Sequence, residues 1–373
     1  MKPKIGLVLT FLFLFSLPVA LGQDSSYYSN PDGSHVLVPL ENLEVTFTDR
    51  YGIPHRALIY LPPDFDSSRK YPAVICCGGW MGFLEMYTIM PRILAYHGYI
   101  AMLFEPTLET TLVSSMILST VTPKWVQDVQ DAITYLTEQS PVKDSVDPSK
   151  IGIEGHSMGG FTVSREAVVD TRVKAVIALS DATPLAGLFK QVPLMIITGD
   201  FDIVVNDQLV AIPAYYAAQP PKELIVIKYG THDGFSNLLE PYYPKAPWQH
   251  YTWEHYASAW FDYWLKNDES AFQKLTHTLY TPNGTECLSA VHRSVYNFGE
   301  GDVVIAGPRL ESPSQPSVST SQATSSTPPA SGQTQGGGWG SLLGDLFSKI
   351  IGQFLPRLAE AFSRFLSSLK FPF

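Results

Sequence analysis

The sequence is poor in cysteine and in charged residues. Its 373 residues include three cysteines, Cys76, Cys77 and Cys287, and only 16% of the residues are charged. Three cysteines do not make a disulfide framework, and a bridge between the neighbours Cys76 and Cys77 would be strained. These two cysteines lie in an apolar run, so we expect them to act as small buried hydrophobic residues. No partner for Cys287 can be read from the sequence.

Basic residues are scarcer than acidic ones. The chain has 25 Lys and Arg against 35 Asp and Glu, which gives a formal net charge of −10. Binding of nucleic acid requires clustered Lys and Arg against the phosphates, so this balance argues against a nucleic-acid partner. No group of residues with metal-ligand spacing stands out either, and we expect neither a metal nor another cofactor.

The N-terminus has the pattern of a secretory signal peptide. Lys2 and Lys4 precede an apolar segment at residues 5–19, and Ala-Leu-Gly at residues 20–22 fits a small-x-small cleavage site. The predicted signal peptide is residues 1–22, so the mature chain would be secreted and would begin at Gln23. The apolar segment is short for a membrane span, although an uncleaved N-terminal anchor is the alternative.

The C-terminal part has two compositions of its own. Residues 307–338 are rich in Ser, Thr, Pro and Gly, with few large apolar side chains, which predicts a flexible linker. In residues 339–373, apolar side chains recur at helical spacing with charges on the other side, and Pro356 predicts a kink or a break into two helices. We expect this amphipathic helical tail to attach the protein to a membrane surface or a hydrophobic partner. Self-association and packing back onto the preceding domain are the alternatives.

Between residues 23 and 306, short apolar segments alternate with segments of helical periodicity. This alternation predicts an α/β domain with a mostly parallel central sheet and helices on both faces. An N-terminal antiparallel hairpin is predicted where residues 43–47 alternate apolar and polar and an apolar run follows at residues 58–61. The expected strands are residues 73–77, 99–104, 151–154, 173–179, 194–198 and 224–227, and the expected helices are residues 85–97, 125–137, 160–169 and 251–265.

The segment Gly-His-Ser-Met-Gly at residues 155–159 is the most informative motif. It joins an expected strand to an expected helix, which is the arrangement of a nucleophile elbow with Ser157 at its tip. Small residues two positions either side of the serine let the strand and the helix pass closely, and the helix N-terminus points its N–H groups at the reacting centre. Ser157 is therefore the predicted nucleophile.

A serine nucleophile needs a histidine base that a carboxylate orients. On the α/β-hydrolase fold these residues follow in the chain order Ser, acid, His. His232 is the histidine that comes just after the last expected strand, and it is the predicted base. The strand at residues 194–198 runs into Gly-Asp-Phe-Asp, so Asp202 is the predicted acid and Asp200 is the alternative, with a local turn role as its other interpretation.

The tetrahedral intermediate requires two N–H donors for its oxyanion. Met158, the residue after the nucleophile, is expected to supply one backbone N–H. The loop after residues 73–77 reads Gly-Gly-Trp-Met-Gly, and the backbone N–H of Trp80 is the predicted second donor. Gly79 or Met81 would take this role if the register differs. The Trp80 indole is also a candidate to line the substrate pocket.

Residues from about 40 to 300 resemble the dienelactone hydrolase branch of the α/β-hydrolase superfamily and are similar to secreted cutinase-like polyester hydrolases. The matching segments are Asp-Pro-Ser-Lys at 147–150, Gly-His-Ser-Met-Gly-Gly at 155–160, the turn at 199–202, Gly-Thr-His at 230–232 and Ala-Trp-Phe at 259–261. The resemblance implies an α/β-hydrolase fold and an ester hydrolase that uses Ser157, Asp202 and His232 without a cofactor.

The chain departs from the polyester hydrolases at two places. Those enzymes pair an aromatic residue at the Trp80 position with a tryptophan beyond the next strand, whereas residues 180–184 here read Ser-Asp-Ala-Thr-Pro. Their C-terminal disulfide is not reproduced, because Cys287 has no obvious local partner.

These features predict a secreted serine hydrolase that cleaves small or polymeric carboxylic esters through an acyl-enzyme intermediate. A serine peptidase or a lactone hydrolase of the same fold is one alternative, although peptidases of this superfamily usually carry a large extra domain that residues 23–306 do not accommodate. A non-catalytic surface-binding protein is the other alternative, which the presence of Ser157, Asp202 and His232 disfavours.

Overall fold

The computed structural model divides the chain into two compact units, Met1–Pro313 and Ser314–Phe373. All the residues that the structure describes belong to the first unit. The predicted signal peptide (1–22), linker (307–338) and amphipathic tail (339–373) lie outside the described residues. The described residues are 26–29, 35–37, 40–80, 82–107, 124–183, 192–237, 246–277, 279–281, 284, 286–296 and 302–303.

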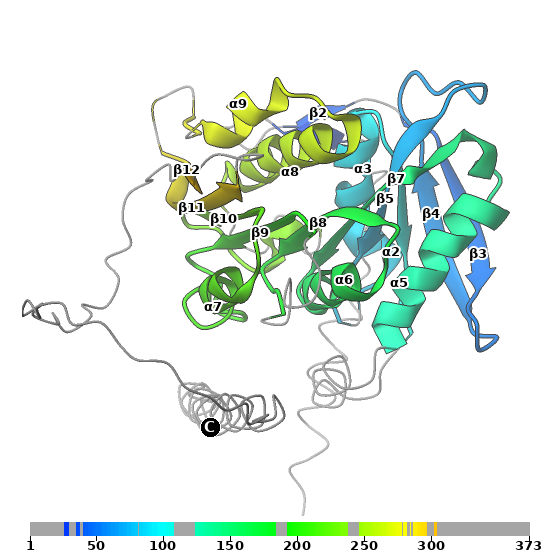
Figure 1. Cartoon of the computed structure of the whole chain (residues 1–373), viewed down its shortest axis with the longest axis horizontal. Coiled ribbons are helices and arrows are strands. Elements are labelled where there is room, and N and C mark those ends of the chain that lie inside the picture. Colours follow the sequence, from blue (N-terminus) through cyan, green and yellow to red (C-terminus); the bar gives the residue numbers. More distant parts are fainter. Residues whose placement is uncertain are drawn as a thin grey trace, which may run out of the picture. The chain divides into compact units, whose positions relative to one another are not determined.

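The described residues form a ten-stranded, mostly parallel sheet, as the sequence predicts for an α/β-hydrolase fold (Figure 1). The strand order is β12-β11-β10-β9-β8-β7-β5-β6-β4-β3, and neighbours are parallel from β10 to β6. The parallel strands are β5 (Tyr71–Cys77), β6 (Ile100–Phe104), β7 (Val146–His156), β8 (Val173–Leu179), β9 (Leu194–Gly199) and β10 (Lys222–Ile227).

The two edges of this sheet are antiparallel. At one edge β3 (Asn42–Thr48) and β4 (Pro54–Tyr60) form the predicted hairpin, with Leu43 opposite Ile59. At the other edge β11 (Leu288–Tyr296) and β12 (Asp302–Val303) continue the sheet beyond β10. Neither of these last strands was predicted, and a separate pair, β1 (Ser26–Ser29) and β2 (His35–Leu37), was not predicted either.

Helices cover both faces of the sheet because side chains of each central strand alternate between the faces. On β5, Ile75 and Cys77 belong to one buried cluster, whereas Val74 and Cys76 belong to the other. The first cluster lies under α5 (Lys124–Thr134), α6 (Met158–Val169) and α7 (Ala211–Ala217), and the second lies under α2 (Leu84–Tyr87), α3 (Ile89–Tyr96), α8 (Gln249–Lys266) and α9 (Ala271–Thr276) (Figure 1).

The predicted helices are present, with differences at their ends and α7 and α9 in addition. The helix expected at residues 85–97 is divided at Thr88 into α2 and α3, and α5 continues into a π-helical turn at Tyr135–Gln139. The last long helix, α8, ends where Asn267 adopts a left-handed conformation with φ of 57°. Asparagine tolerates this conformation, which stops a helix.

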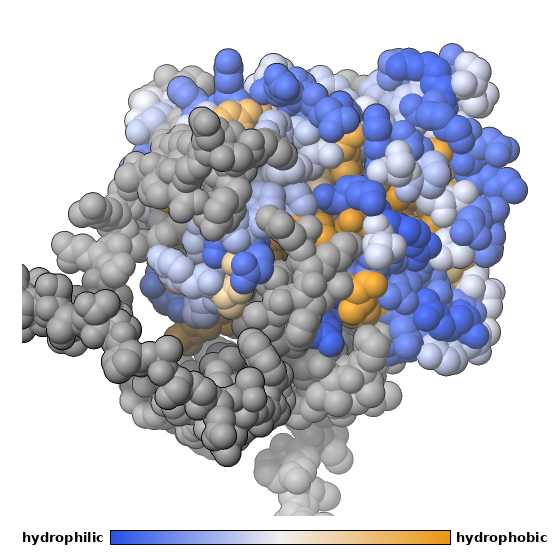
Figure 2. Space-filling view, viewed as in Figure 1, coloured by the Kyte–Doolittle hydropathy of each residue, from blue (hydrophilic) through white to orange (hydrophobic). Residues whose placement is uncertain are grey.

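The surface in Figure 2 is mostly hydrophilic over β3, β4 and α5, with apolar residues toward the middle of this face. Among the described residues, no helix has the length and hydrophobicity needed to cross a bilayer. Cys76, Cys77 and Cys287 are all buried and unbridged, so the prediction that Cys76 and Cys77 act as buried hydrophobic residues is confirmed.

Candidate active site

Ser157 lies between the end of β7 and the start of α6, in a conformation that few non-glycine residues adopt. Its φ is 54° and its ψ is −122°, so the side chain stands at the tip of a strained turn. The turn also requires a very close approach of α6 to β5, because a Cβ atom at Gly159 would lie 2.2 Å from the carbonyl oxygen of Cys77. Glycine at position 159 therefore makes the elbow geometry sterically feasible.

The structure brings Ser157, His232 and Asp202 together from three separate loops at the carboxyl ends of the strands. His232 Nε2 lies 3.0 Å from Ser157 Oγ, and His232 Nδ1 lies 2.8 Å from Asp202 Oδ2. These two contacts form a continuous hydrogen-bond chain from hydroxyl to imidazole to carboxylate. His232 and Asp202 are buried, at 8% and 2% exposure, whereas Ser157 is half-buried and open to a reactant.

Asp202 is held in its orientation by the backbone of its own loop. Its Oδ1 accepts the N–H groups of Val204 and Val205 at 2.9 and 2.7 Å, which leaves Oδ2 for His232. The alternative acid, Asp200, is exposed and accepts the N–H of Tyr229 at 2.5 Å. Asp200 therefore joins two neighbouring loops, and Asp202 is the carboxylate that contacts the imidazole.

Two opposing effects determine the pKa of His232. Burial lowers it, but the hydrogen bond and negative charge of Asp202, with smaller contributions from Asp233 and Asp181, raise it by more. The net result is a pKa above the ordinary value of 6.5. A base of this kind accepts a proton readily once the pH exceeds its pKa.

The loop after β5 passes beside the nucleophile. A Cβ atom at Gly79 would lie 3.2 Å from Ser157 Cβ, so the backbone of Gly79, which Trp80 follows in the chain, adjoins the serine. The Gly79 backbone forms a hydrogen bond with the Tyr87 hydroxyl. Burial raises the pKa of this hydroxyl, and the hydrogen bond opposes the shift. The Gly79 backbone therefore has a partner in Tyr87. Trp80 is the next residue of the loop, and Met81 lies outside the described residues.

Met158 is the first residue of α6 and follows Ser157 directly. N–H groups in the first turn of a helix have no intrahelical partner, and the positive end of the helix dipole lies there. The Trp80 side chain is partly buried against the core on this face of the sheet. The loop after β5 and the start of α6 can therefore present N–H groups to a developing oxyanion from two sides.

Two residues behind His232 were not assigned a role from the sequence. The His156 ring lies 4.6 Å from the His232 ring, and its Nδ1 is 3.0 Å from the Tyr87 hydroxyl. Burial, and then the charge of His232, lower the pKa of His156 well below 6.5, so this ring is neutral. His156 is part of the nucleophile motif itself, but its place in the sequence does not indicate that its ring contacts Tyr87 and His232.

Asp181, just beyond the end of β8, is a third residue that the sequence did not assign. Burial raises its pKa to about 7, although the charge of His232 opposes this shift. Asp181 occupies the stretch where the polyester hydrolases that the chain resembles have a tryptophan. A titratable carboxyl therefore lies within electrostatic reach of His232 in place of an apolar ring.

A family model described as PET hydrolase-like matches residues 44–281. The matched range includes the elbow, the loop after β5, and the loops that carry Asp202 and His232. No curated protein matches the chain.

Proposed function

The chain belongs to the PET hydrolase-like family of α/β hydrolases, which act on esters, and we propose that it is a serine hydrolase that cleaves carboxylic esters through an acyl-enzyme. The observation that carries the proposal is the hydrogen-bond chain from Ser157 Oγ through His232 to Asp202, at 3.0 and 2.8 Å. The proposed nucleophile, base and acid are these three residues.

In the proposed reaction, Ser157 Oγ attacks the ester carbonyl carbon while His232 Nε2 takes the hydroxyl proton. Asp202 accepts the Nδ1–H of His232, which fixes the tautomer and stabilises the imidazolium. The backbone N–H groups of Met158 and Trp80 stabilise the oxyanion. His232 then gives its proton to the leaving alcohol, and water activated by the same base hydrolyses the acyl-enzyme.

The proposal is tested with nitrophenyl esters of increasing acyl length, together with the Ser157→Ala variant. We expect turnover by the natural sequence and a loss of several orders of magnitude in Ser157→Ala. A fluorophosphonate probe should label Ser157 in the natural sequence only. Nitrophenyl ester turnover that survives Ser157→Ala would show that another residue is the nucleophile.

Asp200 and Asp202 provide a matched pair for the acid assignment, because both follow β9 two residues apart. Asp202→Asn should lower kcat by about 10⁴, since an amide no longer fixes the His232 tautomer that can accept the serine proton. Asp200→Asn should leave kcat within about threefold, because its carboxylate contacts Tyr229 instead. The reverse order of effects would make Asp200 the acid.

We also propose that residues 339–373 attach the exported protein to a membrane surface, on the basis of their amphipathic pattern and of the signal-like residues 1–22. The full chain should sediment with anionic liposomes, and a chain that ends at Gly338 should not. Both should turn over soluble esters equally, since the tail lies outside the family match. Oligomers that only the full chain forms, without sedimentation, would replace membrane attachment by self-association.

A further inference from the structure

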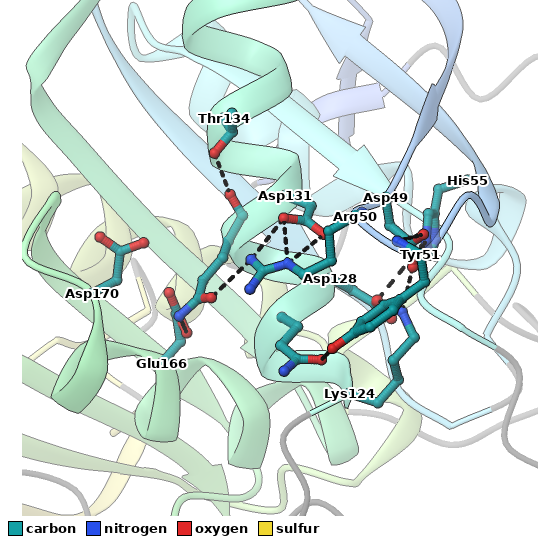
Figure 3. A network of polar contacts seen from close by, with 12 residues as sticks. Asp49, Arg50, Tyr51, His55, Lys124, Asp128, Asp131, Thr134, Glu166 and Asp170 are labelled. Carbon is teal, nitrogen blue, oxygen red and sulfur yellow. Dashed lines mark hydrogen bonds and ion pairs between the residues drawn. The ribbon is translucent and has the colours of Figure 1, made fainter.

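Three buried side chains face one another in the region between the β3–β4 hairpin and α5 (Figure 3). Asp49 lies in the hairpin turn, His55 on β4 and Asp128 on α5, and their exposures are 5%, 2% and 0%. One carboxylate oxygen of each aspartate and the imidazole Nε2 all lie within 4.8 Å of one another. None of these elements carries Ser157, His232 or Asp202.

Backbone N–H groups hold the two carboxylates in place. Asp49 Oδ1 accepts the N–H groups of Tyr51 and Ile53 at 2.9 and 2.7 Å, and Asp128 Oδ2 accepts the N–H of Thr107 at 2.9 Å. These contacts leave Oδ2 of Asp49 and Oδ1 of Asp128 directed toward the centre of the group. Fixing the second oxygen of a ligand in this way is typical of metal sites.

The imidazole is fixed with its acceptor nitrogen toward the same centre. His55 Nδ1 lies 2.8 Å from the carbonyl oxygen of Glu105, so Nδ1 carries the proton and donates it. Nε2 of this tautomer has a lone pair and is buried, and it has no hydrogen-bond partner in the part of the chain that the structure describes. It lies 3.6 Å from Asp49 Oδ2 and 3.9 Å from Asp128 Oδ1, two atoms that can only accept. A cation between these three atoms would satisfy all of them.

The Lys124 ammonium forms ion pairs with the two aspartates of this group. Its Nζ contacts Asp49 Oδ2 and Asp128 Oδ1, the two oxygens directed to the centre. The ammonium brings one positive charge to two carboxylates and forms no hydrogen bond with the lone pair of His55 Nε2. The lysine side chain is 21% exposed and reaches the group from the first turn of α5, so it can move outward into solvent.

We propose that Asp49, His55 and Asp128 form a site for a divalent first-row transition-metal ion such as Zn²⁺, which replaces the Lys124 ammonium. One imidazole nitrogen and two carboxylate oxygens suit such an ion better than they suit Ca²⁺ or Mg²⁺, which prefer oxygen alone. Bonds of about 2.0–2.2 Å in a tetrahedral arrangement place ligand atoms roughly 3.3 Å apart. The observed separations of 3.6 and 3.9 Å are a few tenths of an ångström wider.

The charges and the position indicate what the ion would do. A divalent ion neutralises both carboxylates, whereas Lys124 neutralises one of them. The ion would join the β3–β4 turn to α5 and thus act on stability, because its ligands come from the edge of the sheet. The sequence did not reveal the site, since its ligands are separated by 6 and 73 positions and have no spacing typical of a metal motif.

The test is calorimetric titration of the full-length protein with Zn²⁺ after treatment with a chelator. We expect the natural sequence to bind, and Lys124→Met to bind at least about tenfold tighter because the competing ammonium is gone. Lys143→Met, which removes an exposed lysine, should bind like the natural sequence. Asp128→Asn keeps an acceptor for the Thr107 N–H but removes the charge, and it should weaken binding by about 10- to 100-fold.

Co²⁺ provides a second measurement, because its visible absorption reports nitrogen ligation and coordination geometry. The absorption spectrum of Co²⁺ bound to the Lys124→Met variant should differ from that of Co²⁺ bound to the double variant Lys124→Met, His55→Gln. Zn²⁺ affinity equal in Lys124→Met and Lys143→Met, or unchanged by Asp128→Asn, would overturn the proposal. An unchanged Co²⁺ spectrum after His55→Gln would overturn it too, because the ion would then be bound elsewhere. Circular dichroism identifies any variant that fails to fold, and the Lys124→Met comparison decides alone in that case.

Discussion

Glu154 lies on β7, three residues before Ser157, and its carboxyl group is completely buried. Oε1 accepts a hydrogen bond from the Trp253 indole at 2.8 Å, whereas Oε2 has no hydrogen-bond partner among the described residues. Burial raises the pKa of Glu154 to about 8, and the bond from Trp253 opposes this shift only in part. Glu154 is therefore protonated in the folded protein at neutral pH, although a glutamate in the unfolded chain is ionised.

The sign of the pH effect follows from this difference. Between pH 4.5, the ordinary pKa, and the folded pKa of about 8, the folded state holds a proton that the unfolded state has lost. The free energy of unfolding therefore falls as the pH rises through this window, by about 1.4 kcal/mol for each pH unit. The whole shift corresponds to an upper bound of about 5 kcal/mol, and the loss is complete above pH 8.

Glu154→Gln removes the titration and keeps an oxygen acceptor for the Trp253 indole. The free energy of unfolding of the variant, relative to the natural sequence, should increase between pH 5 and 8 by about 3–5 kcal/mol and then stay level. Urea unfolding at several pH values measures this difference, with the exposed Glu138→Gln as the control for an equal change in charge. A constant difference across this pH range would refute the assignment of a buried, protonated Glu154.

Three further outcomes follow from the structure. Asp181→Asn should move the acidic limb of the pH profile of kcat/KM to lower pH by about half a unit, because the Asp181 charge raises the pKa of His232. If this limb stays at the same pH, Asp181 does not act on the pKa of His232. Gly159→Ala should destabilise the protein by about 3 kcal/mol and abolish ester turnover, since its Cβ would meet the Cys77 carbonyl oxygen. An unchanged unfolding temperature with full turnover would contradict the close packing of α6 against β5. Removing Zn²⁺ with a chelator should leave ester turnover at 25 °C unchanged but lower the unfolding temperature, by the equivalent of about 2.7 kcal/mol when the metal was present at 100 times its Kd; turnover that needs added metal would contradict the proposed mechanism.

The six central strands could be predicted because each is a short apolar run that its sequence alone distinguishes. The positions of Ser157, Asp202 and His232 followed, since parallel strands end at one edge of the sheet and residues just beyond those ends must meet. The preference for Asp202 over Asp200 rested on the reach of the loop. In the structure, Asp200 accepts the N–H of Tyr229, while Asp202 contacts the imidazole of His232.

Other features depend on contacts between elements, which no local pattern encodes. The break at Thr88 occurs inside a helical pattern. Asn237, which belongs to a loop distant in sequence, donates a hydrogen bond to the Thr88 hydroxyl at 2.8 Å. The pair Tyr87 and His156 likewise forms only when α2 packs beside the end of β7. The strands β11 and β12 extend the sheet beyond β10. The apolar sequence of β10 allowed its prediction, as the last strand of the sheet.

The surroundings of the proposed catalytic residues combine an exposed apolar rim on the Asp202 loop with a carboxyl group near His232. Phe201, Ile203 and Val204 flank Asp202 and are 62%, 85% and 65% exposed, so the loop offers apolar surface beside the site. Asp181 belongs to the stretch where the polyester hydrolases that the chain resembles have a tryptophan, and burial raises the pKa of its carboxyl group to about 7. A carboxylate repels the electron-rich face of an aromatic ring and holds water, whereas an exposed apolar rim favours contact with aliphatic chains. Aliphatic esters should therefore be turned over faster than esters of aromatic diacids, and Asp181→Trp should narrow that difference, because it replaces the carboxyl group with an aromatic ring.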